Sequence, residues 1–167
     1  MHAPAGLRLP SIAVTRIVGE VTSYGRDDGV ETGGFLLAPS HDPEAVSVVA
    51  MAGETGIERA WGWFRVSASA IDVLFAWAEE RGLRIPAQFH SHGIGRDLSL
   101  IDRREGFNVR GFISCVVPEF RDPPSVPNGW GWWLFDGASW VETASCTLVE
   151  SEVMVVRFDE EGVRGEA

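Results

Sequence analysis

The segment from Ser67 to Leu83, SASAIDVLFAWAEERGL, most constrains the fold because it has the pattern of a helix between two strand-like segments. Its apolar residues recur at spacings of three and four, and Ser67 or Ser69 can cap its first turn. The flanking segments 61–66 and 84–92 have the composition of strands. This order predicts a sheet with helices packed against it. The residues expected to form the buried stripe of the helix are Ile71, Leu74, Phe75 and Ala78.

Further segments along the chain repeat these two patterns. Apolar residues between Pro10 and Tyr24 recur with helical spacing, and a proline suits a helix start. The apolar run 152–158 is compatible with a strand or a short helix, and residues from about 160 to 167 are expected to form a flexible tail. We therefore predict a single domain, residues 1–167, with an α/β fold in which helices and strands form an α/β/α sandwich. Strands are also expected at residues 35–38, 46–52, 110–117, 129–135 and 139–149.

Charge and cysteine usage limit the possible partners and compartments. The chain of 167 residues carries a formal net charge of -10, and an acidic surface repels a phosphate backbone, so we expect no nucleic-acid partner. A basic protein or peptide partner stays open.

Cys115 and Cys146 stand alone in apolar runs, without a C-x-x-C motif, which favours buried thiols in a reducing cytoplasm. No apolar run approaches the length of a membrane span, so no membrane association is expected.

Two histidines, His90 and His92, lie at the end of a predicted strand. Residues i and i+2 of a strand share one face, so both imidazoles can point at the same position. Zinc in catalytic sites commonly takes three protein ligands at roughly 2 Å and leaves a fourth position for water. Asp97 and Asp102 are candidates for the third ligand. We prefer Asp102, because the Ser99-x-x-Asp102 pattern indicates the first turn of a short helix, whereas Asp97 lies in a loop flanked by glycine.

A catalytic zinc site also needs a base that takes a proton from the attacking water. Glu31 is the candidate, because it precedes Thr32-Gly33-Gly34 just before a predicted strand. The two glycines allow the backbone to approach another strand or a substrate closely.

Together the segments ETGGFLL, HSH and SLID resemble the JAB/MPN zinc metalloproteases, whose JAMM motif combines a distant Glu, H-x-H and S-x-x-D. The resemblance covers most of the chain. It implies a cytidine-deaminase-like α/β/α sandwich with a mixed central sheet, and a Zn²⁺ ion bound by His90, His92 and Asp102. It also implies that Glu31 is the general acid/base and that Ser99 stabilises the tetrahedral intermediate.

The same resemblance implies a function. Proteins of this family are isopeptidases or peptidases that cleave after the C-terminal tail of a ubiquitin-like protein, so the expected partners are such a protein or its conjugates. Bacterial members often accompany ubiquitin-like conjugation, sulfur-carrier or defence pathways, and the amino-acid usage of this chain suits a bacterial source.

The sequence departs from the family pattern in one loop, and this leaves an alternative open. Only six residues separate His92 from Ser99, one fewer than is usual, and Gly93 stands where proline is common. Gly93 and Gly95 are expected to absorb the difference through positive φ angles. If the loop kept Asp102 away from the histidines, the chain would be a non-catalytic MPN-like scaffold. A zinc deaminase is excluded, because H-x-E and P-C-x-x-C motifs are both missing from the sequence.

Overall fold

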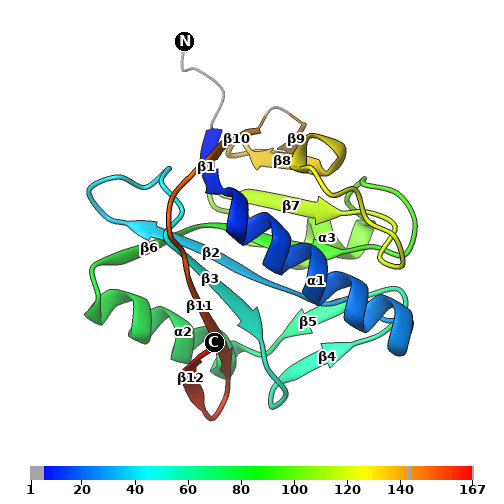
Figure 1. Ribbon diagram of the computed structural model, residues 1–167, viewed down its shortest axis with the longest axis horizontal. Coiled ribbons are helices and arrows are strands. Elements are labelled where there is room, and N and C mark those ends of the chain that lie inside the picture. The colour runs from blue at the N-terminus through cyan, green and yellow to red at the C-terminus, as the bar shows by residue number, and fades with distance from the viewer. Residues whose placement is uncertain (1–5, 143, 167) are drawn as a thin grey trace.

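The structure is a computed structural model that describes residues 6–142 and 144–166 (Figure 1). Its centre is an eight-stranded sheet with the strand order β12-β11-β3-β2-β6-β7-β8-β9. The pairs β11 with β3 and β6 with β7 are parallel and the other neighbours are antiparallel, so the sheet is mixed. The strands are β2 (Gly33–Pro39), β3 (Val48–Ala52), β6 (Leu83–Ser91), β7 (Ile113–Val117), β8 (Gly131–Phe135), β9 (Trp140–Val141), β11 (Met154–Asp159) and β12 (Gly162–Gly165).

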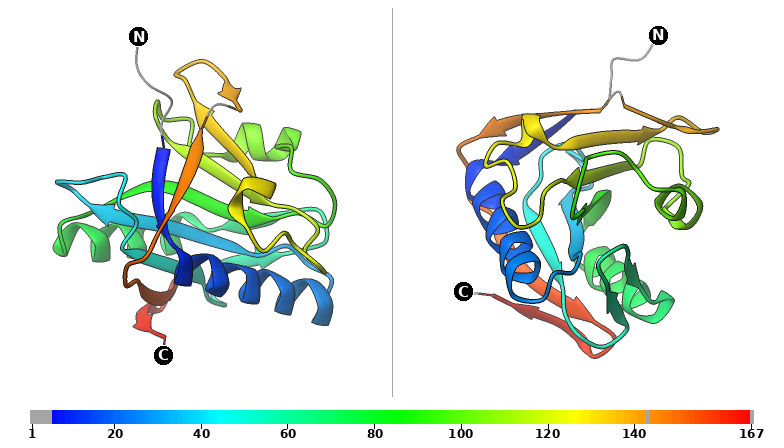
Figure 2. Two further views of the ribbon diagram at one scale, coloured as in Figure 1. Left: turned by 45° about the horizontal axis from the view of Figure 1, so that its top comes forward. Right: turned by 90° about the vertical axis from the view of Figure 1, so that its right-hand side faces the viewer.

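Helices cover both faces of this sheet (Figure 2). On one face lies α1 (Ser11–Asp27), whose Ile17 and Val21 are fully buried in the larger apolar cluster. On the other face lie α2 (Ala68–Glu80) and the short α3 (Leu100–Glu105). The side chain of Ser67 caps α2 by accepting a hydrogen bond from the backbone N–H of Ala70. Within the described residues, no helix has both the length and the apolar character needed to cross a membrane.

Two small sheets complete the architecture. Strands β1 (Gly6–Pro10) and β10 (Ser145–Val149) pair in parallel, and Leu7 and Leu9 pack into the same apolar cluster as α1. Strands β4 (Ile57–Arg59) and β5 (Phe64–Val66) form an antiparallel hairpin that lies before α2 in the chain. The 3-10 turn η1 (Pro127–Gly129) precedes β8.

The chain ends differ from the sequence expectation. Residues 162–165 were expected in a flexible tail, but they form β12, which pairs antiparallel with β11. The turn Glu160–Glu161 is held by Asp159, whose carboxylate accepts the N–H of Glu161 at 3.0 Å. The run 152–158, for which strand and helix were both open, forms most of the strand β11, which ends at Asp159. At the other end of the chain, the expectation missed β1.

Three interior predictions also need correction. The strand expected at 139–149 is two strands, β9 and β10, which belong to different sheets; residue 143 lies outside the described residues. The strand expected at 61–66 is limited to its second half, and Trp61 is 62% exposed. Phe75, expected in the buried stripe of α2, is 43% exposed, because Ala70, Leu74 and Ala78 form that stripe.

Candidate metal centre

The H-x-H pair lies at the C-terminal end of β6, a central strand of the sheet. His90 pairs in register with Gly33 on β2 and with Val116 on β7, so neighbouring strands fix its position on both sides. His92 follows the strand, and its N–H donates to Val117 O at 2.9 Å. The two Nε2 atoms are 3.1 Å apart, and both side chains are nearly buried. The structure therefore brings both imidazoles to one point, as the alternation of a strand predicts.

Asp102 approaches this point from α3. Its Oδ2 lies 3.2 Å from His90 Nε2 and 3.0 Å from His92 Nε2. The same oxygen accepts the N–H of Ser99 at 2.9 Å, while Ser99 Oγ accepts the N–H of Asp102 at 3.0 Å. This reciprocal capping box fixes the first turn of α3 and holds the carboxylate in place. Asp97, the other sequence candidate, is exposed.

The shortened loop between His92 and Ser99 does reach the site. Gly95 has φ +79°, as expected, and its N–H donates to Glu119 Oε1 at 3.1 Å. Gly93 has no positive φ; it lies close to Phe120 and Trp61 instead, so that part of the expectation was wrong. Leu98 is buried at the end of the loop, and Trp133 Nε1 donates to the carbonyl oxygen of Arg96 at 3.0 Å. The loop is therefore anchored at several points between the histidines and α3.

Glu31 lies two residues before β2 and is almost completely buried, with 4% exposure. Its carboxylate and the nearest ring nitrogens of His90 and His92 all lie within 4.8 Å of one another, so these three residues could hold a metal ion. Within the described residues, Glu31 Oε1 is buried without a hydrogen-bond partner. Burial, followed by the nearby carboxylate of Asp102, raises the pKa of Glu31 to about 9.

The two glycines after Thr32 are required by close backbone contacts. A Cβ atom on Gly33 would lie 2.4 Å from Phe89 O, and one on Gly34 would lie 2.0 Å from Ala50 O. No side chain fits at these distances. The glycines therefore let β2 lie against its neighbours, which places Glu31 beside the histidines at the end of β6.

The donor atoms fit a divalent cation. In a tetrahedral site with ligand bonds of about 2.1 Å, neighbouring ligand atoms are about 3.4 Å apart. The triangle of His90 Nε2, His92 Nε2 and Asp102 Oδ2 has sides of 3.0–3.2 Å, only slightly smaller. Two effects act on the pKa of Asp102. Burial alone would raise this pKa, but the hydrogen bonds from His90 and His92 are stronger in effect, and the pKa of Asp102 lies well below its usual range. The carboxylate is thus ready to bind a cation.

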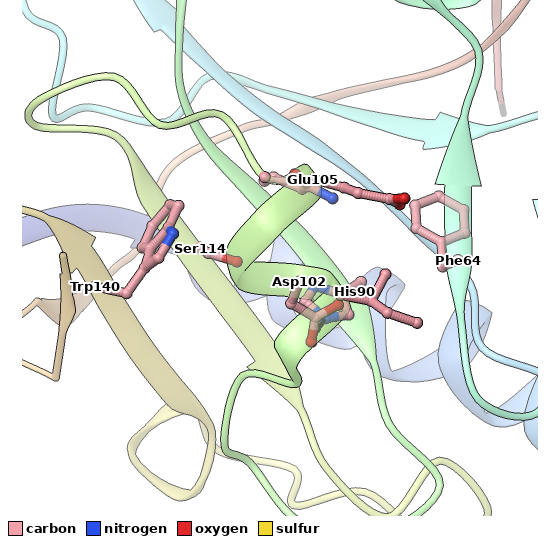
Figure 3. Close-up of a pocket in the computed structure, with 9 residues that line it drawn as sticks. Phe64, His90, Asp102, Glu105, Ser114 and Trp140 are labelled. Carbon is pink, nitrogen blue, oxygen red and sulfur yellow. Dashed lines mark ion pairs between the residues drawn. The ribbon is translucent and has the colours of Figure 1, made fainter. Parts of the chain in front are cut away.

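A small cavity of about 40 Å³ lies beside His90 and Asp102, between α3 and the sheet (Figure 3). Glu105 and Phe64 line one end of the cavity, and Trp140 and Ser114 line the other. A larger groove of about 430 Å³ shares lining residues with it and runs between β5, α2 and the end of α3. The residues common to both are Phe64, Gln88, Glu105 and Gly106.

The sequence analysis did not identify Thr32 and Ser91, which connect the backbone next to Glu31 with the backbone between the two histidines. Ser91, between the two histidines, donates its N–H to Thr32 O at 2.8 Å and accepts the Thr32 N–H on its Oγ at 2.9 Å. Both side chains belong to buried residues. Their only signal in the sequence was a polar residue at a position where a buried strand is expected to be apolar.

Comparison with known proteins supports the fold. No protein-family model and no curated protein matches the sequence. Among solved structures, a protein from Desulfitobacterium hafniense has a TM-score of 0.67 and 15% identity, covering 87% of this chain and 94% of its own. A protein from Salinibacter ruber has a TM-score of 0.54 and 20% identity over 88% of this chain and 90% of its own. A JAB1/MPN domain protein from Archaeoglobus fulgidus has a TM-score of 0.50 and 15% identity over 86% and 98%.

These likenesses define the fold class. The chain has a mixed α/β fold with helices on both faces of a mixed sheet, similar to that of a JAB1/MPN domain protein, as the sequence predicted. The buried cluster of Glu31, His90 and His92 lies in this fold at the end of the central strand β6.

Proposed function

We propose that this protein is a zinc-dependent isopeptidase or peptidase of the JAMM type. The observation that carries the proposal is the triangle of His90, His92 and Asp102 with the buried Glu31 carboxylate next to it. Two neutral imidazoles and one carboxylate are a common ligand set of catalytic zinc, and they leave one position open.

Each residue has a distinct role in this proposal. His90, His92 and Asp102 hold the zinc ion, which when bound supplies Lewis acidity and activates water. Glu31 accepts a proton and returns it to the leaving group. Without a cation its pKa of about 9 keeps it protonated near neutral pH, so this role requires the positive charge of a bound ion to lower that pKa. Ser99 donates its hydroxyl hydrogen to the developing oxyanion, while Ser99 Oγ still accepts the N–H of Asp102.

The proposed substrate is the C-terminal tail of a ubiquitin-like protein, or a conjugate of one, in a bacterial conjugation or defence pathway. Support comes from the sequence resemblance and from the groove of about 430 Å³ beside β5, which adjoins the cavity at His90 and Asp102. Cys115 and Cys146 are unpaired, which is compatible with the cytoplasmic location that we propose.

The alternative, a non-catalytic MPN-like scaffold, depended on a loop too short to bring Asp102 to the histidines. Asp102 Oδ2 lies within 3.2 Å of both Nε2 atoms, so this reason for preferring a scaffold disappears.

Metal analysis and a cleavage assay test the proposal. Purified protein should bind about one zinc ion per chain, and linear and isopeptide fusions of ubiquitin-like proteins encoded nearby should be cleaved. Glu31→Ala should retain zinc and lose cleavage. A wild-type protein that binds no zinc, or a fully active Glu31→Ala variant, would contradict the mechanism.

A further inference from the structure

We propose that Arg59 is a positioning residue for Glu31 and that it acts through Thr32. The inference rests on the proposed role of Glu31 as the base. Arg59 lies at the end of β4 and does not contact a candidate metal ligand in any hydrogen bond of the described residues. Its Nε instead donates to Thr32 Oγ1 at 2.9 Å, on the residue directly after Glu31.

The position of the Glu31 carboxylate depends on its backbone. Its Oε1 is buried without a partner in the described part of the chain, so hydrogen bonds of this oxygen do not hold the side chain. The backbone is held instead: Glu31 N–H donates to Ala60 O at 2.8 Å, and Thr32 exchanges hydrogen bonds with Ser91. Ala60 directly follows Arg59. Two consecutive residues, Arg59 at the end of β4 and Ala60 after it, therefore hold Glu31 through its N–H and Thr32 through its hydroxyl.

Arg59 is itself firmly anchored. Its Nη1 donates to Gly53 O at 2.8 Å and its Nη2 donates to Ala52 O at 2.7 Å, at the end of β3. The guanidinium carbon lies 4.2 Å from the centre of the Tyr24 ring on α1. A planar guanidinium with three directed hydrogen bonds and a stacked aromatic ring is fixed in orientation, which a lysine could not reproduce. Arg59 therefore connects the Glu31 segment to the rigid frame formed by β3 and α1.

The hydrogen bonds of Arg59 indicate that it affects the position of Glu31. Its hydrogen bonds to Thr32, Ala52 and Gly53 end on neutral oxygen atoms. A base that transfers protons must lie within hydrogen-bond reach of its target, so a small displacement of the backbone at residue 31 has a large effect.

Hydrogen exchange of the metal-free protein tests the positioning directly. In Arg59→Met, we expect the amides of Glu31 and Thr32 to exchange at least about tenfold faster, relative to amides inside β2 and β7. Arg157→Met is the matched control, because Arg157 also donates to Ala52 O and bridges α1 to β11, but makes no bond to Thr32. Equal exchange of Glu31 and Thr32 in Arg59→Met and Arg157→Met would overturn the inference.

Variants of Thr32 isolate the same contact if Arg59→Met does not fold. Thr32→Val keeps the shape of the side chain but cannot accept the Arg59 hydrogen bond, so it should release the Glu31 amide in the same way. Thr32→Ser keeps a hydroxyl and should restore protection. If Thr32→Val leaves the Glu31 amide protected as in wild type, the inference is wrong.

Cobalt loading connects the position of Glu31 to the metal centre. Visible absorption of the Co²⁺-loaded protein should change with pH, and Glu31→Gln should shift the midpoint. We expect Arg59→Met to shift it in the same direction, and the double variant to resemble Glu31→Gln alone, because one residue acts through the other. A wild-type midpoint in Arg59→Met, or additive shifts, would refute the coupling. Failure of wild type to bind Co²⁺ would refute the metal centre, whereas hydrogen exchange would still decide the role of Arg59.

Discussion

At the scale of single residues, Glu31 is the most unusual group in the site. A carboxyl that is 4% exposed, with one oxygen lacking a partner among the described residues, stays protonated at pH values where ordinary glutamates are ionised. The pKa of about 9 in the folded protein means that ionisation of Glu31 opposes folding. A cation bound beside the carboxylate would offset this cost.

Glu31→Gln should therefore stabilise the metal-free protein in a pH-dependent way. The folded state retains the Glu31 proton from about pH 4.5 up to about pH 9, whereas the unfolded state loses it, so wild-type stability falls across this range. Glutamine does not ionise, and we expect a gain of about 2–4 kcal/mol in unfolding free energy at pH 8 and almost none at pH 4. Urea unfolding at both pH values measures it. Glu58→Gln, at an exposed position, should show no such difference.

Asp102→Asn should weaken zinc binding by at least about 100-fold, because the amide lacks the charge that holds the cation. Asparagine can still accept the Ser99 N–H through its side-chain oxygen, so α3 should stay folded. Competition with a chelating dye measures the affinity. Asp97→Asn, in the loop that leads to α3, is the control, and a comparable loss of zinc affinity there would contradict the assignment of Asp102 as the third ligand.

At the scale of elements, α3 carries the candidate ligand Asp102 although none of its residues is buried. Apart from the capping box, it is tied to β5 by the bidentate pair of Arg65 and Glu105, with both N–O distances at 3.0 Å. An exposed ion pair adds little stability. The capping box of Ser99 and Asp102 is therefore the main interaction that keeps Asp102 in place.

Ser99→Ala should consequently lower zinc affinity by roughly fivefold, the equivalent of losing a cap worth about 1 kcal/mol. Ser67→Ala provides a matched control, since it removes the same kind of cap from α2 and should cost similar stability without changing zinc affinity. Titration calorimetry and thermal unfolding of both variants separate the two effects. Equal zinc affinities in Ser99→Ala and wild type would show that the cap does not position Asp102.

Strand β2 requires glycine at its first residue, Gly33, because a neighbouring strand lies too close for a side chain. Gly33→Ala would place a methyl group 2.4 Å from Phe89 O, and we expect a loss of at least about 2 kcal/mol in unfolding free energy. Gly19→Ala in α1 meets nothing within 4 Å and should stabilise by up to about 1 kcal/mol. Chemical unfolding of the two variants checks both signs, and a neutral Gly33→Ala would mean that the strands can separate without cost.

At the scale of the whole molecule, the site joins parts of the chain that only the fold brings together. Glu31 precedes β2, the histidines end β6, and Asp102 belongs to α3 on the face opposite α1. A cation bound to these residues would link the sheet to one of its helical layers. Its binding free energy would then add to the stability of the folded state.

Zinc should therefore raise the melting temperature. At a free zinc concentration of 100 times the dissociation constant, the gain is about 2.7 kcal/mol, which corresponds to a shift of about 5–10 °C for a chain of this size. Scanning calorimetry of chelator-treated and zinc-loaded protein measures it. His90→Ala with His92→Ala should abolish the shift, and a persistent shift in that variant would place zinc elsewhere.

The sequence by itself was sufficient for most elements and for the identity of the clustered side chains. Strand alternation put His90 and His92 on one face, and the Ser99-x-x-Asp102 pattern located the start of α3, because both follow from local backbone geometry. The same local rules failed where partners are distant in sequence. They missed β1, joined β9 to β10 and left the residues of β12 as a tail, because those strands exist through pairing that no local pattern encodes.

Tertiary structure alone decided the distances and the environment of the site. The approach of Asp102 through a six-residue loop depends on Leu98, Trp133 and Glu119 as anchors, and the placement of Glu31 depends on Thr32, Ser91 and Arg59. These contacts are between residues far apart in the chain, and they determine burial, on which the pKa of Glu31 depends. Local sequence determines which chemical groups are present and which way they face, whereas long-range packing determines how close they come and how much water surrounds them.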